Sequence, residues 1–71
     1  MTATEMFRNL GYIKYTMVGT GNIVYRNKNF YVKFIVRNQT VIADRMAMSF
    51  EIDVALFQAI KKQLEELEWL K

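Results

Sequence analysis

Carboxylates, tyrosines, lysines and arginines are the side chains that could do chemistry in this chain of 71 residues, because it contains no histidine and no cysteine. Those absences exclude a Ser-His-Asp or Cys-His nucleophile, a thiolate redox centre, a His or Cys metal site and a disulfide. Glu51 and Asp53 are two residues apart, so in a strand both would face the same side and could bind a hard cation through oxygen alone. No third carboxylate is close to them in the sequence, and Asp53 is placed to cap a helix. We therefore expect no catalytic residue, no metal site, no cofactor and no enzyme activity.

A second candidate site is a phosphate-binding loop, because Gly19 and Gly21 have the spacing of the glycines in such a loop. A dinucleotide fingerprint needs a third glycine that opens a helix, and a P-loop needs Gly-Lys-Ser/Thr. Here the chain continues into the strand-like residues 23–26 instead. Because glycine adopts positive φ at little cost, the pair predicts a turn.

Charge is unevenly distributed along the chain, whose formal net charge is +3. Residues 1–45 contain seven cationic and two acidic side chains, a net of +5, whereas residues 46–71 contain three and five, a net of −2. A basic front and an acidic end can serve an acidic partner, or can attract each other in an oligomer.

The chain is expected to form one small domain over residues 1–71. A domain of this size buries only about 60% of the surface of its unfolded chain, so its core is marginal and a second copy or a larger partner is expected. The segment MTATEMFRNLGY has no signal-peptide pattern, and no apolar run is long enough to span a bilayer. The lack of cysteine fits a cytoplasmic protein.

Helices are expected near both ends. Thr2 and Glu5 have the spacing of a capping box, which predicts a helix over residues 3–10. Asp53 can cap a longer helix that runs to about Trp69. The apolar stripe expected on that second helix consists of Leu56, Phe57, Ile60, Leu64 and Leu67.

Between the helices the chain is rich in β-branched and aromatic residues, which favours strands. We expect strands over residues 12–18, 23–26, 30–37 and 40–45, and a possible fifth over 48–52. Two-residue turns at Asn27-Lys28 and Asn38-Gln39 would place Tyr25 opposite Phe30, Val36 opposite Val41, Phe34 opposite Ala43, and Lys33 opposite Asp44. The core face of the sheet would then consist of Ile23, Tyr25, Phe30, Val32, Phe34, Val36, Val41 and Ala43. The fold class is thus α+β: an antiparallel meander of four to five strands, with a short N-terminal and a longer C-terminal helix on one face.

The other face of the sheet is the candidate binding site. It mixes cations, a tyrosine and aliphatic side chains, whereas the solvent face of an antiparallel sheet is usually polar. Its expected binding residues are Val24, Arg26, Tyr31, Lys33, Ile35, Arg37 and Ile42, with Thr40 beside them. Three interpretations remain open: an ordinary exposed face, a protein interface, and a surface for single-stranded nucleic acid that stacks bases and holds phosphates.

The two ends of the chain, MTATEMFRNLGY and DVALFQAIKKQLEELEWL, resemble those of short uncharacterised proteins encoded by phages and prophages of Gram-positive bacteria. This resemblance implies a phage or mobile-element origin without a biochemical activity. The order of elements is also similar to HicA-type mRNA-cleaving toxins and to the double-stranded-RNA-binding fold. HicA-like toxins need a Gly-Ser-His segment, where this chain has Gly19-Thr20-Gly21-Asn22. That resemblance therefore implies no nuclease activity, although RNA binding by the basic half stays possible.

Together these patterns predict a small non-enzymatic interaction module in the host cytoplasm. Its partner would be a host or phage protein, or a second copy, bound through the open face of the sheet. The alternative is nucleic-acid binding by the same face, with Lys14, Lys28 and Arg45 around its edge.

Overall fold

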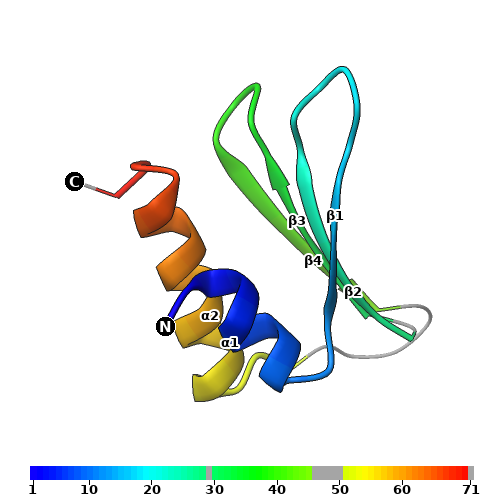
Figure 1. Cartoon of the computed structure of the whole chain (residues 1–71), viewed down its shortest axis with the longest axis vertical. Helices are drawn as coiled ribbons and strands as arrows, with labels where there is room; N and C mark the ends of the chain where they lie inside the picture. The colour runs from blue at the N-terminus through cyan, green and yellow to red at the C-terminus, as the bar shows by residue number, and fades with distance from the viewer. Residues whose placement is uncertain (29, 46–50, 71) are drawn as a thin grey trace.

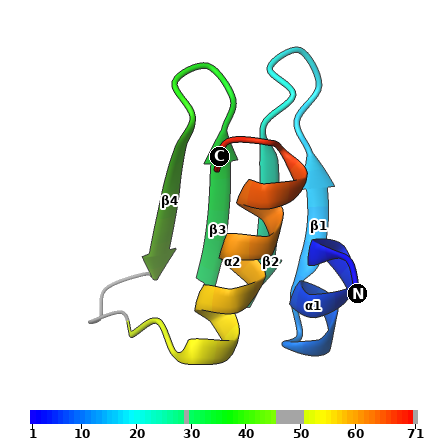
Figure 2. The ribbon, with the colours of Figure 1, turned by 90° about the vertical axis from the view of Figure 1, so that its left-hand side faces the viewer.

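The computed structural model describes residues 1–28, 30–45 and 51–70. Its elements follow in the order α1 (Ala3–Asn9), β1 (Ile13–Thr16), β2 (Ile23–Asn27), β3 (Phe30–Ile35), β4 (Thr40–Arg45) and α2 (Val54–Glu66). The four strands form one antiparallel sheet in the order β1-β2-β3-β4. Both helices lie on one side of this sheet, with α1 in front of β1 and α2 crossing β2 and β3 (Figures 1 and 2). The expected α+β meander is confirmed. Residues 48–50 of the possible fifth strand lie outside the described residues, and Glu51 and Ile52 are not in a strand.

Local capping explains where the two helices begin. The Thr2 hydroxyl accepts from the Glu5 amide at 3.1 Å, and the Glu5 carboxylate accepts from the Thr2 amide at 2.8 Å, so the capping box is confirmed. The Asp53 carboxylate accepts from the Leu56 amide at 2.8 Å and caps α2. This helix ends earlier than expected, because Glu68 adopts a φ of +62° and the Trp69 amide donates back to Leu64. No helix among the described residues is long and apolar enough to cross a membrane.

An aromatic cluster fills the space between the helices and the sheet. The ring of Phe7 stacks on that of Tyr25 with 3.8 Å between centroids, and Phe34 meets both rings edge-on. All three side chains are fully buried, as is Val32. Trp69 turns back to contact Phe34, so the chain after α2 also covers the core.

Polar contacts join α1, α2 and β2. The Tyr25 hydroxyl donates to the buried Gln63 amide oxygen on α2 and lies 3.2 Å from the Thr4 hydroxyl on α1. The Glu66 carboxylate accepts from the Ala3 amide at 2.7 Å, across the two helices. Glu66 therefore joins the start of α1 to α2.

The register between β2 and β3 differs from the expected one by two residues. Tyr25 pairs with Val32, not with Phe30, and Asn27 is the last residue of β2. The turn begins at Lys28, whose φ of +49° supplies the left-handed conformation that a tight hairpin needs.

The register between β3 and β4 also differs by two residues. Phe34 pairs with Val41, and Lys33 pairs with Ile42 instead of Asp44, which lies opposite Tyr31. The loop covers residues 36–39, with Gln39 at a φ of +55°, so it is longer than the expected two-residue turn. Because a slip of two residues returns each side chain to the same face, the two faces are as expected.

The prediction of a core position was wrong for two residues, Val36 and Phe57. Val36 lies in the loop after β3 and is 40% exposed, so it does not pair with Val41. Phe57 is 57% exposed, because α2 buries the side of Leu56, Ala59, Ile60 and Gln63 in the core. Gln63 on this side provides the acceptor that the Tyr25 hydroxyl requires.

Candidate interaction face

The open sheet face is the side of the sheet opposite the two helices (Figure 1). Paired residues of neighbouring strands point to the same side, so the register defines its members. They are Ile13, Tyr15, Val24, Arg26, Tyr31, Lys33, Ile35, Thr40, Ile42 and Asp44. None of the helices and strands that the structure describes covers this face (Figure 1).

The structure brings together six of the seven residues that the sequence indicated as binding residues. Val24, Arg26, Tyr31, Lys33, Ile35 and Ile42 all lie on the open sheet face. Arg37 lies instead in the loop 36–39, at one end of the face. Ile13, Tyr15 and Asp44 were missed, although the alternation Ile13-Lys14-Tyr15-Thr16 was a signal that β1 also contributes.

Apolar side chains are unusually exposed on this face. Ile13 is 63% exposed, Tyr15 50% and Ile42 41%. Val24 and Ile35 are half-buried among them. Ile13 and Tyr15 lie on β1 and Ile42 lies on β4, so exposed apolar side chains occur at both edges of the sheet.

Cations and apolar side chains alternate across the strands of this face. One row runs Ile13, Arg26, Tyr31, Asp44 and the next runs Tyr15, Val24, Lys33, Ile42. The Tyr31 hydroxyl lies 3.4 Å from the Asp44 carboxylate, to which it donates. Within the described part of the chain, Arg26, Lys33 and Arg37 form no ion pair.

The two layers of the molecule carry opposite charge. Among the described side chains, the sheet and its loops carry five cations against one carboxylate: Lys14, Arg26, Lys28, Lys33 and Arg37 against Asp44. The helices and their flanks carry three cations against six carboxylates: Arg8, Lys61 and Lys62 against Glu5, Glu51, Asp53, Glu65, Glu66 and Glu68. The open sheet face therefore favours an acidic surface.

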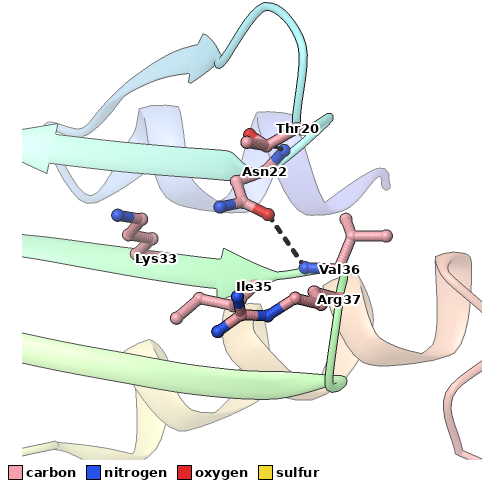
Figure 3. Close-up of a pocket in the computed structure, with 6 residues that line it drawn as sticks. All are labelled: Thr20, Asn22, Lys33, Ile35, Val36 and Arg37. Carbon is pink, nitrogen blue, oxygen red and sulfur yellow. Dashed lines mark hydrogen bonds between the residues drawn. The ribbon is translucent and has the colours of Figure 1, made fainter.

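A pocket of about 470 Å³ lies at the end of the face where β2 begins and β3 ends (Figure 3). We call it the end pocket; its lining residues are Thr20, Asn22, Lys33, Ile35, Val36 and Arg37. The Asn22 side chain, only 8% exposed, accepts from the Val36 amide at 2.9 Å and so fastens the loop after β3 to the start of β2. The Arg37 side chain folds back beside Ile35 (Figure 3).

The carboxylates that could have formed a metal site do not do so in the described residues. Glu51 and Asp53 are both exposed, and Asp53 is occupied as the cap of α2. No group of three or more Asp and Glu residues that could hold a metal ion occurs within the described ranges.

The four tyrosines divide between the core and the open sheet face. Burial raises the pKa of Tyr12 and of Tyr25 above the ordinary value, and the negative charges of Asp53 and Glu66 respectively add to the increase. A raised pKa keeps both hydroxyls neutral, as core packing requires. Tyr15 and Tyr31 lie on the open sheet face.

Comparison of the chain with family models, with curated proteins and with solved structures finds no match.

Proposed function

We propose that this chain is a non-enzymatic interaction module that binds a protein partner through its open sheet face. The observation that carries the proposal is the uncovered sheet face, on which the exposed Ile13, Tyr15 and Ile42 alternate with Arg26 and Lys33. The partner surface that complements this pattern presents apolar side chains together with Asp or Glu. We place the module in the cytoplasm of the host of a phage or prophage, which its lack of cysteine and the resemblance of its two ends support.

The composition of the face favours a protein over nucleic acid. A sheet that binds single strands uses neighbouring aromatic rings as a platform for bases. Here Tyr15 and Tyr31 lie in different rows, and β2 separates their strands. The aliphatic side chains between them contribute to a protein interface but not to base stacking.

The charge of the face also disfavours a face-to-face pairing of two copies. Two copies placed face to face would bring Arg26 and Lys33 of each into the same interface. Like charges brought together in an interface cost several kcal/mol. An acidic partner removes this cost, because its carboxylates pair with the same cations.

Introducing a negative charge on each layer tests the proposal. Ile42→Glu places a carboxylate at an exposed position of the open sheet face, and Phe57→Glu makes the same change at an exposed position of α2. Each variant and the wild type would be immobilised and exposed to a nuclease-treated lysate of the cells that encode the chain. A protein retained by wild type would then be purified and its affinity measured. We expect Phe57→Glu to bind like wild type and Ile42→Glu to bind at least about tenfold more weakly, because the new charge meets apolar and acidic side chains.

Several results would contradict this proposal. They are equal affinity of all three baits, loss of binding in Phe57→Glu alone, and a wild-type bait that retains no protein specifically. Binding of single-stranded oligonucleotide that weakens steeply with salt would favour the nucleic-acid alternative.

A further inference from the structure

We propose that the end pocket binds a carboxylate group that is next to an apolar side chain, and that the acidic partner of the open sheet face supplies it. The inference rests on the proposed function, since it assigns a specific contact within the same interface. Ile35 links the two sites, because it belongs to the open sheet face and also lines the end pocket.

The polar side-chain groups left over in the end pocket are donors. The Asn22 amide oxygen already accepts from the Val36 amide at 2.9 Å, which leaves the amide nitrogen to donate. The Thr20 hydroxyl oxygen accepts from the backbone amide of Asn22 at 3.2 Å, which leaves the hydroxyl proton of Thr20 to donate. Lys33 and Arg37 have no acceptor atoms at all. A ligand group that satisfies such a pocket is an acceptor.

The positive charges of the lining residues favour an anion as that acceptor. Lys33 and Arg37 are the charged residues of the lining, and no carboxylate accompanies them. Neither forms an ion pair within the ranges that the structure describes. In Figure 3 the Asn22 amide nitrogen points to the side on which Lys33 lies, away from Val36. Charge-assisted hydrogen bonds from such groups are about twice as strong as neutral ones.

Two of the donors, Asn22 and Lys33, are positioned by the fold before a ligand arrives. Asn22 is almost fully buried and is fastened at both its amide oxygen and its backbone amide. Lys33 is half-buried on β3, a central strand of the sheet. Ile35 and Val36 supply an apolar wall, so an anion that carries an aliphatic group gains contacts that a free anion does not.

Titration of the ¹⁵N-labelled chain with small probes at neutral pH tests this assignment. The probes are N-acetyl-Leu-Asp amide, its neutral counterpart N-acetyl-Leu-Asn amide, and inorganic phosphate. We expect the aspartate peptide to shift the amide signals of Thr20, Asn22 and Val36 saturably, with a dissociation constant on the order of 1 mM, typical of one small contact. The asparagine peptide should be at least fivefold weaker. Arg37→Gln should weaken the aspartate peptide at least fivefold, and Lys61→Gln, on α2, should not change it.

Equal shifts from the two peptides, or unchanged affinity in Arg37→Gln, would overturn the inference. Tighter binding of phosphate than of the aspartate peptide would overturn the carboxylate assignment and identify a phosphate site.

Failure of this inference can be distinguished from failure of the proposed function. If the partner is lost in Ile42→Glu but retained by Arg37→Gln, the end pocket is not part of the interface and only this inference fails. If the aspartate peptide binds as expected while Ile42→Glu retains the partner, the proposed function fails and the end pocket is a carboxylate site of its own.

Discussion

Tyr25 joins the sheet to both helices. Its ring stacks on Phe7 and its hydroxyl donates to the buried Gln63 amide oxygen. Tyr25→Phe keeps the ring but leaves that oxygen buried and unsatisfied. We expect it to lower the free energy of unfolding by about 1–3 kcal/mol, measured by urea denaturation.

Tyr15→Phe is the matched control for this change. Tyr15 is half exposed on the open sheet face, so loss of its hydroxyl should alter stability by no more than about 0.5 kcal/mol. Equal stability of Tyr25→Phe and wild type would show that the hydroxyl contact between Tyr25 and Gln63 does not stabilise the fold.

Alkaline pH tests the same residue by another route. Burial raises the pKa of Tyr25; the hydrogen bond with Thr4 opposes this effect, and the charge of Glu66 adds to it. The folded state holds the Tyr25 proton more tightly than the unfolded state does. The resulting contribution to the free energy of unfolding is complete below the ordinary tyrosine pKa of about 10. It is lost as the pH rises from there through the raised pKa.

We therefore expect the free energy of unfolding to fall above pH 10, and to fall less steeply in Tyr25→Phe, which retains only the effect of Tyr12. Urea denaturation at a series of pH values measures both slopes. The same slope in the two proteins would contradict the burial argument.

At the scale of elements, the N-terminus of α2 depends on one side chain. The Asp53 carboxylate accepts from the Leu56 amide at 2.8 Å. Asp53→Ala removes this cap and should destabilise the protein by about 1 kcal/mol. Asp53→Asn keeps an acceptor at the same place and should cost only a few tenths of a kcal/mol. If thermal denaturation shows no difference between the two variants, the cap contributes nothing to the stability of α2.

The beginnings of the helices could be predicted because their signals are local. Thr2, Glu5 and Asp53 each form hydrogen bonds within three residues, so the sequence alone defines them. The strand registers depend on loop conformation, and the positive φ of Lys28 and Gln39 is not a conformation that these residue types indicate. The faces were still correct, since both slips were of two residues.

The side of α2 that packs on the sheet could not be predicted from its apolar stripe. Phe57 belongs to that stripe but is exposed, whereas the polar Gln63 is buried. The deciding contact is made by Tyr25, which is distant in the sequence and could be paired with Gln63 only once the fold was known. Similarly, Ile13 and Tyr15 join the open sheet face through the pairing of β1 with β2.

At the scale of the whole molecule, the fold separates two kinds of surface. Carboxylates gather around the helices, while cations and exposed aliphatic side chains gather on the sheet. The helices bury one face of the sheet, and the opposite face is the surface that we assign to the partner (Figure 1). Which layer contacts the partner is therefore the central question.

Photo-crosslinking from a single site answers that question most directly. The chain has no cysteine, so one introduced cysteine can carry a benzophenone group at a defined position. Thr40→Cys places it on the open sheet face and Gln58→Cys places it on exposed α2, both at polar positions outside the core. Each labelled protein would be irradiated in a lysate of the cells that encode the chain.

We predict a covalent adduct with a protein from position 40 and none from position 58. Adducts of equal yield from both positions, an adduct from position 58 alone, or no protein adduct from position 40 would contradict the assignment of the open sheet face as the binding surface.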